Sequence, residues 1–202
     1  MDRTLSWTVI GNHSGLPRRV LTAAVPSRLG ALDPLDALLL PATPGPAVTG
    51  PEAVTGDPAT AVGRFLAHPF DKAATLAARV RAGGHGWLCN FPSVDRHDPE
   101  FVSFLSDVDL STEREERVLR VAREGGLRVM LAMSRPRPVD WRPDAVLLVP
   151  PVGGTAPRAG SVRALGLDVP ILSSAPDPDA DALLAAPEVA APLPAPAWPA
   201  GA

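Results

Sequence analysis

The sequence lacks several features that mark particular classes of protein. Cys89 is its one cysteine, which excludes an internal disulfide bond. The net charge is −3 and no basic stripe is interleaved with aromatic residues, which argues against a nucleic-acid-binding surface. No apolar run approaches the ~18 residues of a membrane span, and no apolar core of a signal peptide follows Met1. These absences predict a cytoplasmic protein that binds neither nucleic acid nor membrane.

Lysine is nearly absent as well, since Lys72 is the one lysine among 19 basic residues. We interpret the excess of arginine, alanine and proline as codon bias of a GC-rich, bacterial genome. The 25 prolines and 17 glycines amount to about 21% of the 202 residues, below the roughly 25–30% that suggests disorder. With 46% hydrophobic residues, the chain is predicted to form one domain over residues 1–193, followed by a Pro/Ala-rich disordered tail over 194–202.

Short apolar runs recur along the chain without polar alternation, which is typical of strands buried on both faces of a parallel sheet. The predicted strands are residues 7–10, 36–40, 63–67, 87–89, 127–133, 145–149, 169–172 and 189–193. Helical patterns separate most of them, at residues 16–21, 71–83, 98–105, 112–124, 161–165 and 179–186. Asp71 and Ser111 are the predicted N-caps of two of these helices. A proline-rich stretch, residues 42–61, stands where another helix is expected.

Alternation of strands and helices predicts a parallel α/β fold. Eight repeats favour a compact (β/α)8 TIM barrel with shortened or missing helices, although 202 residues is near the lower limit of that fold. The alternative is an open doubly wound parallel sheet, which suits the length better but usually has fewer strands.

One stretch carries a family resemblance. Residues 86–94 read Gly-Trp-Leu-Cys-Asn-Phe-Pro-Ser-Val and resemble the Gly-Val-Gln-Asn-Phe-Pro-Thr-Val segment of the phosphoenolpyruvate hydrolase-like proteins. This is a TIM-barrel family related to the C-terminal domain of a tomato virus-resistance protein. The similarity extends over residues 65–149 and includes the Gly126-Leu127 pair after the charged helix. It departs at Cys89, where the family has glutamine, and in the proline-rich stretch. The resemblance implies a divergent, shortened barrel with lyase, hydrolase or isomerase activity.

In a (β/α)8 barrel the active site lies at the carboxyl ends of the strands, and polar residues follow the predicted strands at those ends. His68 is the candidate acid–base group, Cys89 a candidate nucleophile if a base is near, and Asn90 a candidate donor to a carboxylate or enolate. The structural alternatives are a turn-ordering histidine, a small buried hydrophobe and a turn-holding amide. The candidate substrate-binding residues are His13, Ser14, Ser93, Ser134, Arg135, Gly153, Gly154, Ser173 and Ser174.

These features lead us to expect an enzyme that uses acid–base chemistry on a small anionic or carbonyl substrate, without a metal or other cofactor. A homo-oligomer is compatible with the sequence. The alternative is a non-catalytic barrel that serves as a binding or partner subunit, which the trimmed loops favour. The charges over residues 113–123 are interpreted as a solvated helix face with i,i+4 pairs.

Overall fold

The computed structural model describes residues 16–17, 19–22, 56, 58–69, 71–155, 157–167 and 169–173. Its strands are β1 (Arg19–Thr22), β2 (Thr60–Gly63), β3 (Trp87–Cys89), β4 (Arg128–Met133), β5 (Ala145–Leu148) and β6 (Ile171–Ser173). Its helices are α2 (Ala73–Ala82), η3 (Val94–Arg96, a 3-10 turn), α3 (Pro99–Asp107), α4 (Thr112–Glu124) and α5 (Ala159–Arg163). The elements predicted at 7–10, 36–40, 179–186 and 189–193 lie outside the described residues, as does the tail.

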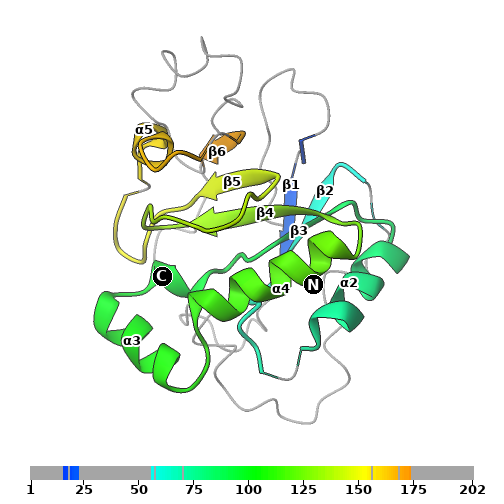
Figure 1. Ribbon diagram of the computed structural model, residues 1–202, viewed down its shortest axis with the longest axis horizontal. Coiled ribbons are helices and arrows are strands. Elements are labelled where there is room, and N and C mark those ends of the chain that lie inside the picture. The colour runs from blue at the N-terminus through cyan, green and yellow to red at the C-terminus, as the bar shows by residue number, and fades with distance from the viewer. Residues whose placement is uncertain are drawn as a thin grey trace, which may run out of the picture.

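The six described strands form one parallel sheet in the order β1-β2-β3-β4-β5-β6 (Figure 1). Leu88 pairs with Val129, and Leu131 pairs with Val146, so neighbouring strands are aligned along their buried segments. This arrangement confirms the predicted α/β class with a parallel sheet. The order contains no reversal, whereas a doubly wound sheet requires one. The described strands do not close into a ring.

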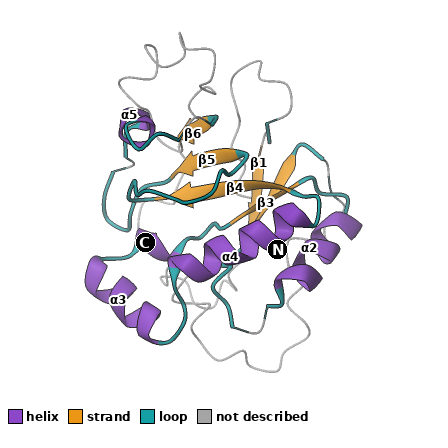
Figure 2. Ribbon diagram, in the orientation of Figure 1, coloured by secondary structure: helices purple, strands orange, loops and turns teal. Residues whose placement is uncertain are grey.

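Side chains alternate between two buried faces of the sheet. Leu88, Val129 and Leu131 pack on the face that carries the main helices, against α2 and α4, and Figure 2 shows both helices on the same side of the sheet. Trp87 and Met130 belong to a second cluster on the opposite face. Burial on both faces explains why the strands read as unbroken apolar runs.

The ends of α4 follow the predicted signals. Ser111 is the N-cap, and its hydroxyl accepts a hydrogen bond from the Arg114 backbone N–H. Leu119 and Ala122 are buried on the inner side of the helix. Gly126 follows the helix with a φ of +89°, a conformation that residues with a Cβ rarely adopt. The prediction for residues 112–124 is confirmed.

Three predictions in the first part of the chain are wrong. Residues 19–22 form β1, although the sequence predicts a helix over residues 16–21, because their backbone pairs with β2 and this pairing overrides a weak local helix signal. The strand predicted at 63–67 is β2 instead, ending at Gly63, and Phe65 packs in the following loop. The prediction that Asp71 is the N-cap of the next helix is wrong as well. Lys72 occupies the N-cap position of α2, and the Asp71 carboxylate pairs with Arg64 at 2.8 Å.

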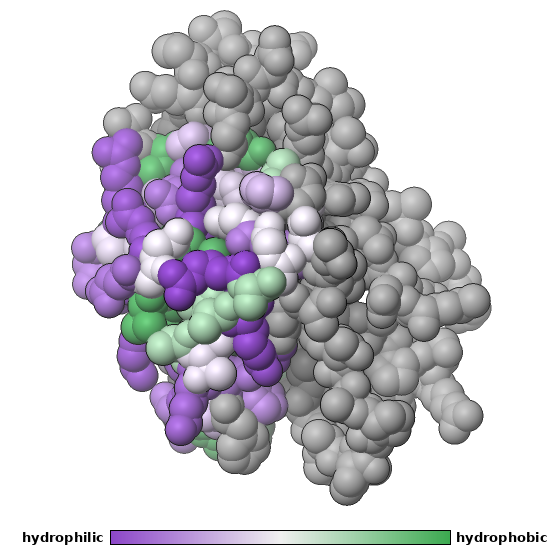
Figure 3. Space-filling view, turned by 90° about the vertical axis from the view of Figure 1, so that its right-hand side faces the viewer, coloured by the Kyte–Doolittle hydropathy of each residue, from purple (hydrophilic) through white to green (hydrophobic). Residues whose placement is uncertain are grey.

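The connection from β4 to β5, residues 134–144, contains no helix. Val139 and Trp141 in this connection pack on the helical side of the core. A parallel crossover without its helix fits the prediction of shortened or missing helices. Among the described residues no helix has both the length and the apolar character to cross a membrane. Figure 3 shows the side of the molecule that carries α2, where the described surface is largely hydrophilic.

Candidate functional site

A group of buried polar side chains, which we call the edge cluster, lies at the carboxyl ends of β3 and β4. Its members come from the loop after β3, from η3, from the first turn of α4 and from the residue after β4. They are Asn90, Ser93, Asp95, Glu115 and Ser134. In parallel α/β folds this end of the sheet is where functional groups converge, so the cluster is the first candidate for a site.

Asn90 is 1% exposed and uses its whole side-chain amide within the protein. Its Oδ1 accepts a hydrogen bond from the Ala132 backbone N–H at 2.7 Å. Its Nδ2 donates to the Ala132 carbonyl at 3.3 Å and to the Glu115 carboxyl at 3.1 Å. The amide therefore extends the β3–β4 pairing beyond Cys89 and joins it to α4.

Glu115 is fully buried, contrary to the prediction of a solvated helix face. Its carboxyl oxygens accept hydrogen bonds from Asn90 and from the Val94 backbone N–H. Burial raises the pKa of Glu115 well above its ordinary value, and the Asn90 hydrogen bond opposes that rise. The nearby Asp95 charge raises the pKa further. The carboxyl group is therefore held in an environment that favours its protonated form.

Glu116 is also buried, so a second glutamate departs from the prediction. It pairs with Arg137 at 2.5 Å and accepts a hydrogen bond from the Trp141 indole N–H at 2.8 Å. Its predicted i,i+4 pair, with Arg120, is present at 4.0 Å. The sequence pattern identified the helix but not this burial, because the loop that covers Glu116 follows a different strand.

Asp95 ties the loops after β3 and β4 together. Its carboxylate accepts hydrogen bonds from the Ser93 hydroxyl at 2.7 Å and from the Ser134 backbone N–H at 2.8 Å. The Arg135 backbone N–H donates to the same carboxylate at 3.3 Å, and the Arg135 guanidinium donates to the Asp95 carbonyl at 2.6 Å. Ser93 and Arg135, predicted to bind substrate, are therefore engaged in holding the loops.

Ser134 is 4% exposed, and its hydroxyl has no hydrogen-bond partner in the described part of the chain. By strand alternation it lies on the same face as Ala132, opposite the main helices. Arg96, 5% exposed, lies with its guanidinium 5.5 Å from the centre of the Phe91 ring, and its Nε donates to the Pro150 carbonyl at 3.2 Å.

Those two contacts of Arg96 belong to the loops after β3 and β5, and β4 lies between these strands in the sheet. Arg96 therefore links the loops on either side of β4, and Ser134 follows β4 at the same end of the sheet. Both side chains are buried at this end of the sheet. Arg96 was not among the predicted site residues, and its distance in sequence from β5 explains why no local pattern indicated it.

Cys89 lies on the sheet face opposite the main helices and is fully buried. Burial raises the pKa of its thiol strongly, and the Glu115 charge raises it further. Because the thiolate is the reactive form, this environment disfavours the predicted nucleophile and fits the structural alternative. His68 lies in the loop after β2 and is partly exposed.

The remaining predicted positions follow the later strands or lie outside the described residues. Gly153 and Gly154 are exposed in the turn after β5, where the Gly154 N–H donates to the Pro151 carbonyl at 3.0 Å. Ser173 ends β6, but its side chain is outside what the structure describes. His13, Ser14 and Ser174 lie outside the described residues. In the described ranges no three His, Cys, Asp or Glu residues are grouped to hold a metal ion.

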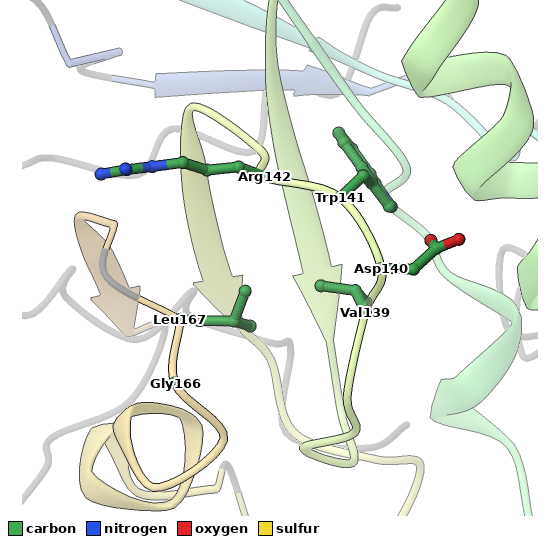
Figure 4. Close-up of a pocket in the computed structure, with 6 residues that line it drawn as sticks. All are labelled: Val139, Asp140, Trp141, Arg142, Gly166 and Leu167. Atoms are coloured by element: carbon green, nitrogen blue, oxygen red, sulfur yellow. The ribbon is translucent and has the colours of Figure 1, made fainter.

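A cavity of about 400 Å³ lies elsewhere, in the part of the fold where the β4–β5 helix is missing. Figure 4 shows Val139 and Leu167 pointing toward each other across it, while Asp140 and Arg142 point away. Val139 and Leu167 also belong to the helical side of the core. This cavity therefore contains none of the predicted site residues.

No protein-family model and no curated protein sequence matches this chain. The resemblance to the phosphoenolpyruvate hydrolase-like proteins therefore stays a prediction from the residues that carry it.

Proposed function

We propose that the protein is a compact (β/α)8-type barrel enzyme, of the phosphoenolpyruvate hydrolase-like kind, that uses acid–base chemistry on a small anionic or carbonyl substrate. The consecutive parallel strand order supports the barrel. Right-handed crossovers place the helices of such a sheet on one face. The other face carries buried Trp87, Met130 and Leu147. Closure of the sheet would turn that face into the interior of a barrel.

The observation that carries the proposal is the buried Ser134 hydroxyl without a described partner, at the sheet end where Arg96 is also buried. Leaving a buried hydroxyl unpaired costs on the order of 1–3 kcal/mol, and such groups in native proteins call for an explanation. A substrate carboxylate or enolate oxygen would accept hydrogen bonds from both side chains. The predicted anionic substrate and this pair of donors are chemically matched.

The other polar residues of the edge take supporting roles in this proposal. Asp95, Asn90 and Glu115 are positioning residues, because their hydrogen bonds hold the loops that present Arg96 and Ser134. His68, in the loop after β2, remains the candidate for proton transfer, since imidazole is the most common general acid and base in enzymes. Cys89 has no catalytic role in the proposal, because its buried thiol favours the protonated form.

A ligand screen tests the proposal. Small carboxylates, keto acids and their phosphorylated forms, phosphoenolpyruvate included, would be screened by NMR against the full chain and then tested for turnover. We expect Ser134→Ala to weaken binding of an active compound by about tenfold, equivalent to ~1.4 kcal/mol. We expect His68→Ala to keep binding but to lose turnover by a factor of about 10² or more. A compound that Ser134→Ala and the wild type bind equally would remove the proposed anion site.

A second candidate function is a non-catalytic binding subunit. The specific observation in its favour is that Cys89 and Asn90, two of the three predicted catalytic residues, are buried and serve the fold. In that case the screen would find ligands whose binding depends on Ser134, with no turnover by the wild type. The same experiment therefore separates the two functions.

A further inference from the structure

Helix α3 lies in the loop between β3 and α4 and projects from the body of the molecule at the lower left of Figure 2. Asp98 caps it by accepting a hydrogen bond from the Phe101 N–H at 2.9 Å. Four apolar residues of the helix and its C-cap follow spacings of three and four, which places them on one stripe. They are Phe101, Phe104, Leu105 and Val108.

The core of the protein covers only one edge of this stripe. Leu105 is buried against Phe65 and Val94. Phe104 is 58% exposed and Val108 is 52% exposed, and they are two of the three exposed large hydrophobic residues among those described. The Phe101 ring stacks on Phe104 with ring centres 6.2 Å apart, which extends the apolar surface toward the core. The described surface around α2, by contrast, is largely hydrophilic (Figure 3).

Negative charge flanks the exposed phenylalanine. Glu100 and Asp107 lie four residues before and three residues after Phe104, so both are its neighbours on the helix surface. Both are exposed, and within the described residues neither has an ion-pair partner. The stretch from 98 to 110 contains no basic residue. The outer face of α3 is therefore an apolar strip with a negative rim.

We propose that this face of α3 is a docking surface for a basic amphipathic helix of another protein. The apolar side of that helix would pack on Phe104 and Val108, and its arginine or lysine side chains would pair with Glu100 and Asp107. Recognition of amphipathic helices through spaced apolar anchors is a common mode of binding. Complementary charge at the rim supplies orientation and speeds association.

A second copy of this chain fits the surface poorly. In a two-fold dimer the same face of α3 would meet itself, which would bring Glu100 and Asp107 against the like charges of the other copy. Val152 is the remaining exposed large hydrophobic residue of the described chain, and it lies in the glycine turn after β5. The described surface therefore offers no basic, apolar face that matches α3.

The test uses a dansyl-labelled peptide of about 18 residues, with leucine on one helical face and arginine on the other, and the full-length protein. A peptide of the same pattern with glutamate in place of arginine is the control probe. We expect the cationic peptide to bind, more weakly as salt is raised, and the anionic peptide not to bind. Phe104→Ala and the pair Glu100→Gln with Asp107→Asn should each weaken binding by about tenfold or more.

The matched control is the pair Glu124→Gln with Asp140→Asn, which removes two exposed carboxylates far from α3 in sequence and should leave binding unchanged. Because Phe104 is exposed, its substitution should not shift the thermal unfolding midpoint, which circular dichroism checks. Equal binding by the wild type and Phe104→Ala, or an equal loss in both charge pairs, would overturn the proposal. So would a dimer in sedimentation that Phe104→Ala dissociates, since that result would assign the face to self-association.

Discussion

Replacing Asn90 by alanine tests whether this predicted catalytic residue instead holds the sheet together. The substitution removes three buried hydrogen bonds, two to Ala132 and one to Glu115. At about 1 kcal/mol for each bond the loss is ~3 kcal/mol, and the buried Ala132 N–H left without a partner adds on the order of 1–2 kcal/mol. We therefore expect Asn90→Ala to lower the free energy of unfolding by about 4–5 kcal/mol, a large part of a typical total.

The measurement is guanidinium unfolding followed by tryptophan fluorescence, because Trp87 is buried in the core and reports the transition. Ser134→Ala is the matched control, since Ser134 is similarly buried at the same edge but its hydroxyl has no described partner. Because that hydroxyl is buried without a described partner, we expect Ser134→Ala to leave the free energy of unfolding unchanged or to raise it by about 1–3 kcal/mol, and not to lower it. A loss below about 1 kcal/mol for Asn90→Ala would refute the structural role and would leave the amide available to a substrate.

Three further substitutions test the edge cluster and helix α4. Glu115→Gln keeps an acceptor for Asn90 but cannot ionise. Because the pKa of Glu115 is raised in the folded state, the wild type loses stability as pH rises from about 4.5 through the folded-state pKa. The variant should therefore gain stability relative to the wild type over that pH range. Denaturant unfolding at several pH values measures the two free energies of unfolding. A difference between them that does not change with pH would contradict the raised pKa of Glu115. Ser111→Ala should cost about 1 kcal/mol of stability, measured in the same way, with Ser106→Ala at an exposed site of α3 as a control that stays near the wild type. Leu119→Ala should cost about 2–5 kcal/mol by leaving a cavity between α4 and the sheet, and a loss under about 1 kcal/mol would show that this site collapses or is less well packed than described.

The edge cluster shows where sequence patterns stop being informative. Asn90 follows a strand in a polar stretch, and that placement suits a catalytic amide and a structural amide equally well. The choice depends on Ala132 and Glu115, which are 42 and 25 residues away along the chain. The helical charge pattern of residues 113–123 similarly predicts solvated carboxylates. Glu115 and Glu116 are buried because the loops after β3 and β4 cover the first turn of α4.

Local sequence patterns by themselves determined the α/β class, the ends of α4 and the core strands β3, β4 and β5. Continuous apolar runs indicate buried strands, and Ser111 and Gly126 indicate the ends of a helix. Each of these signals depends only on residues nearby in the chain. Pairing between distant segments decided the rest. Backbone hydrogen bonding to β2 made residues 19–22 a strand, and contacts between separate loops buried Arg96 and Ser134 at one end of the sheet. Burial and charge at a site are sums over neighbours in space, and only the folded chain specifies those neighbours.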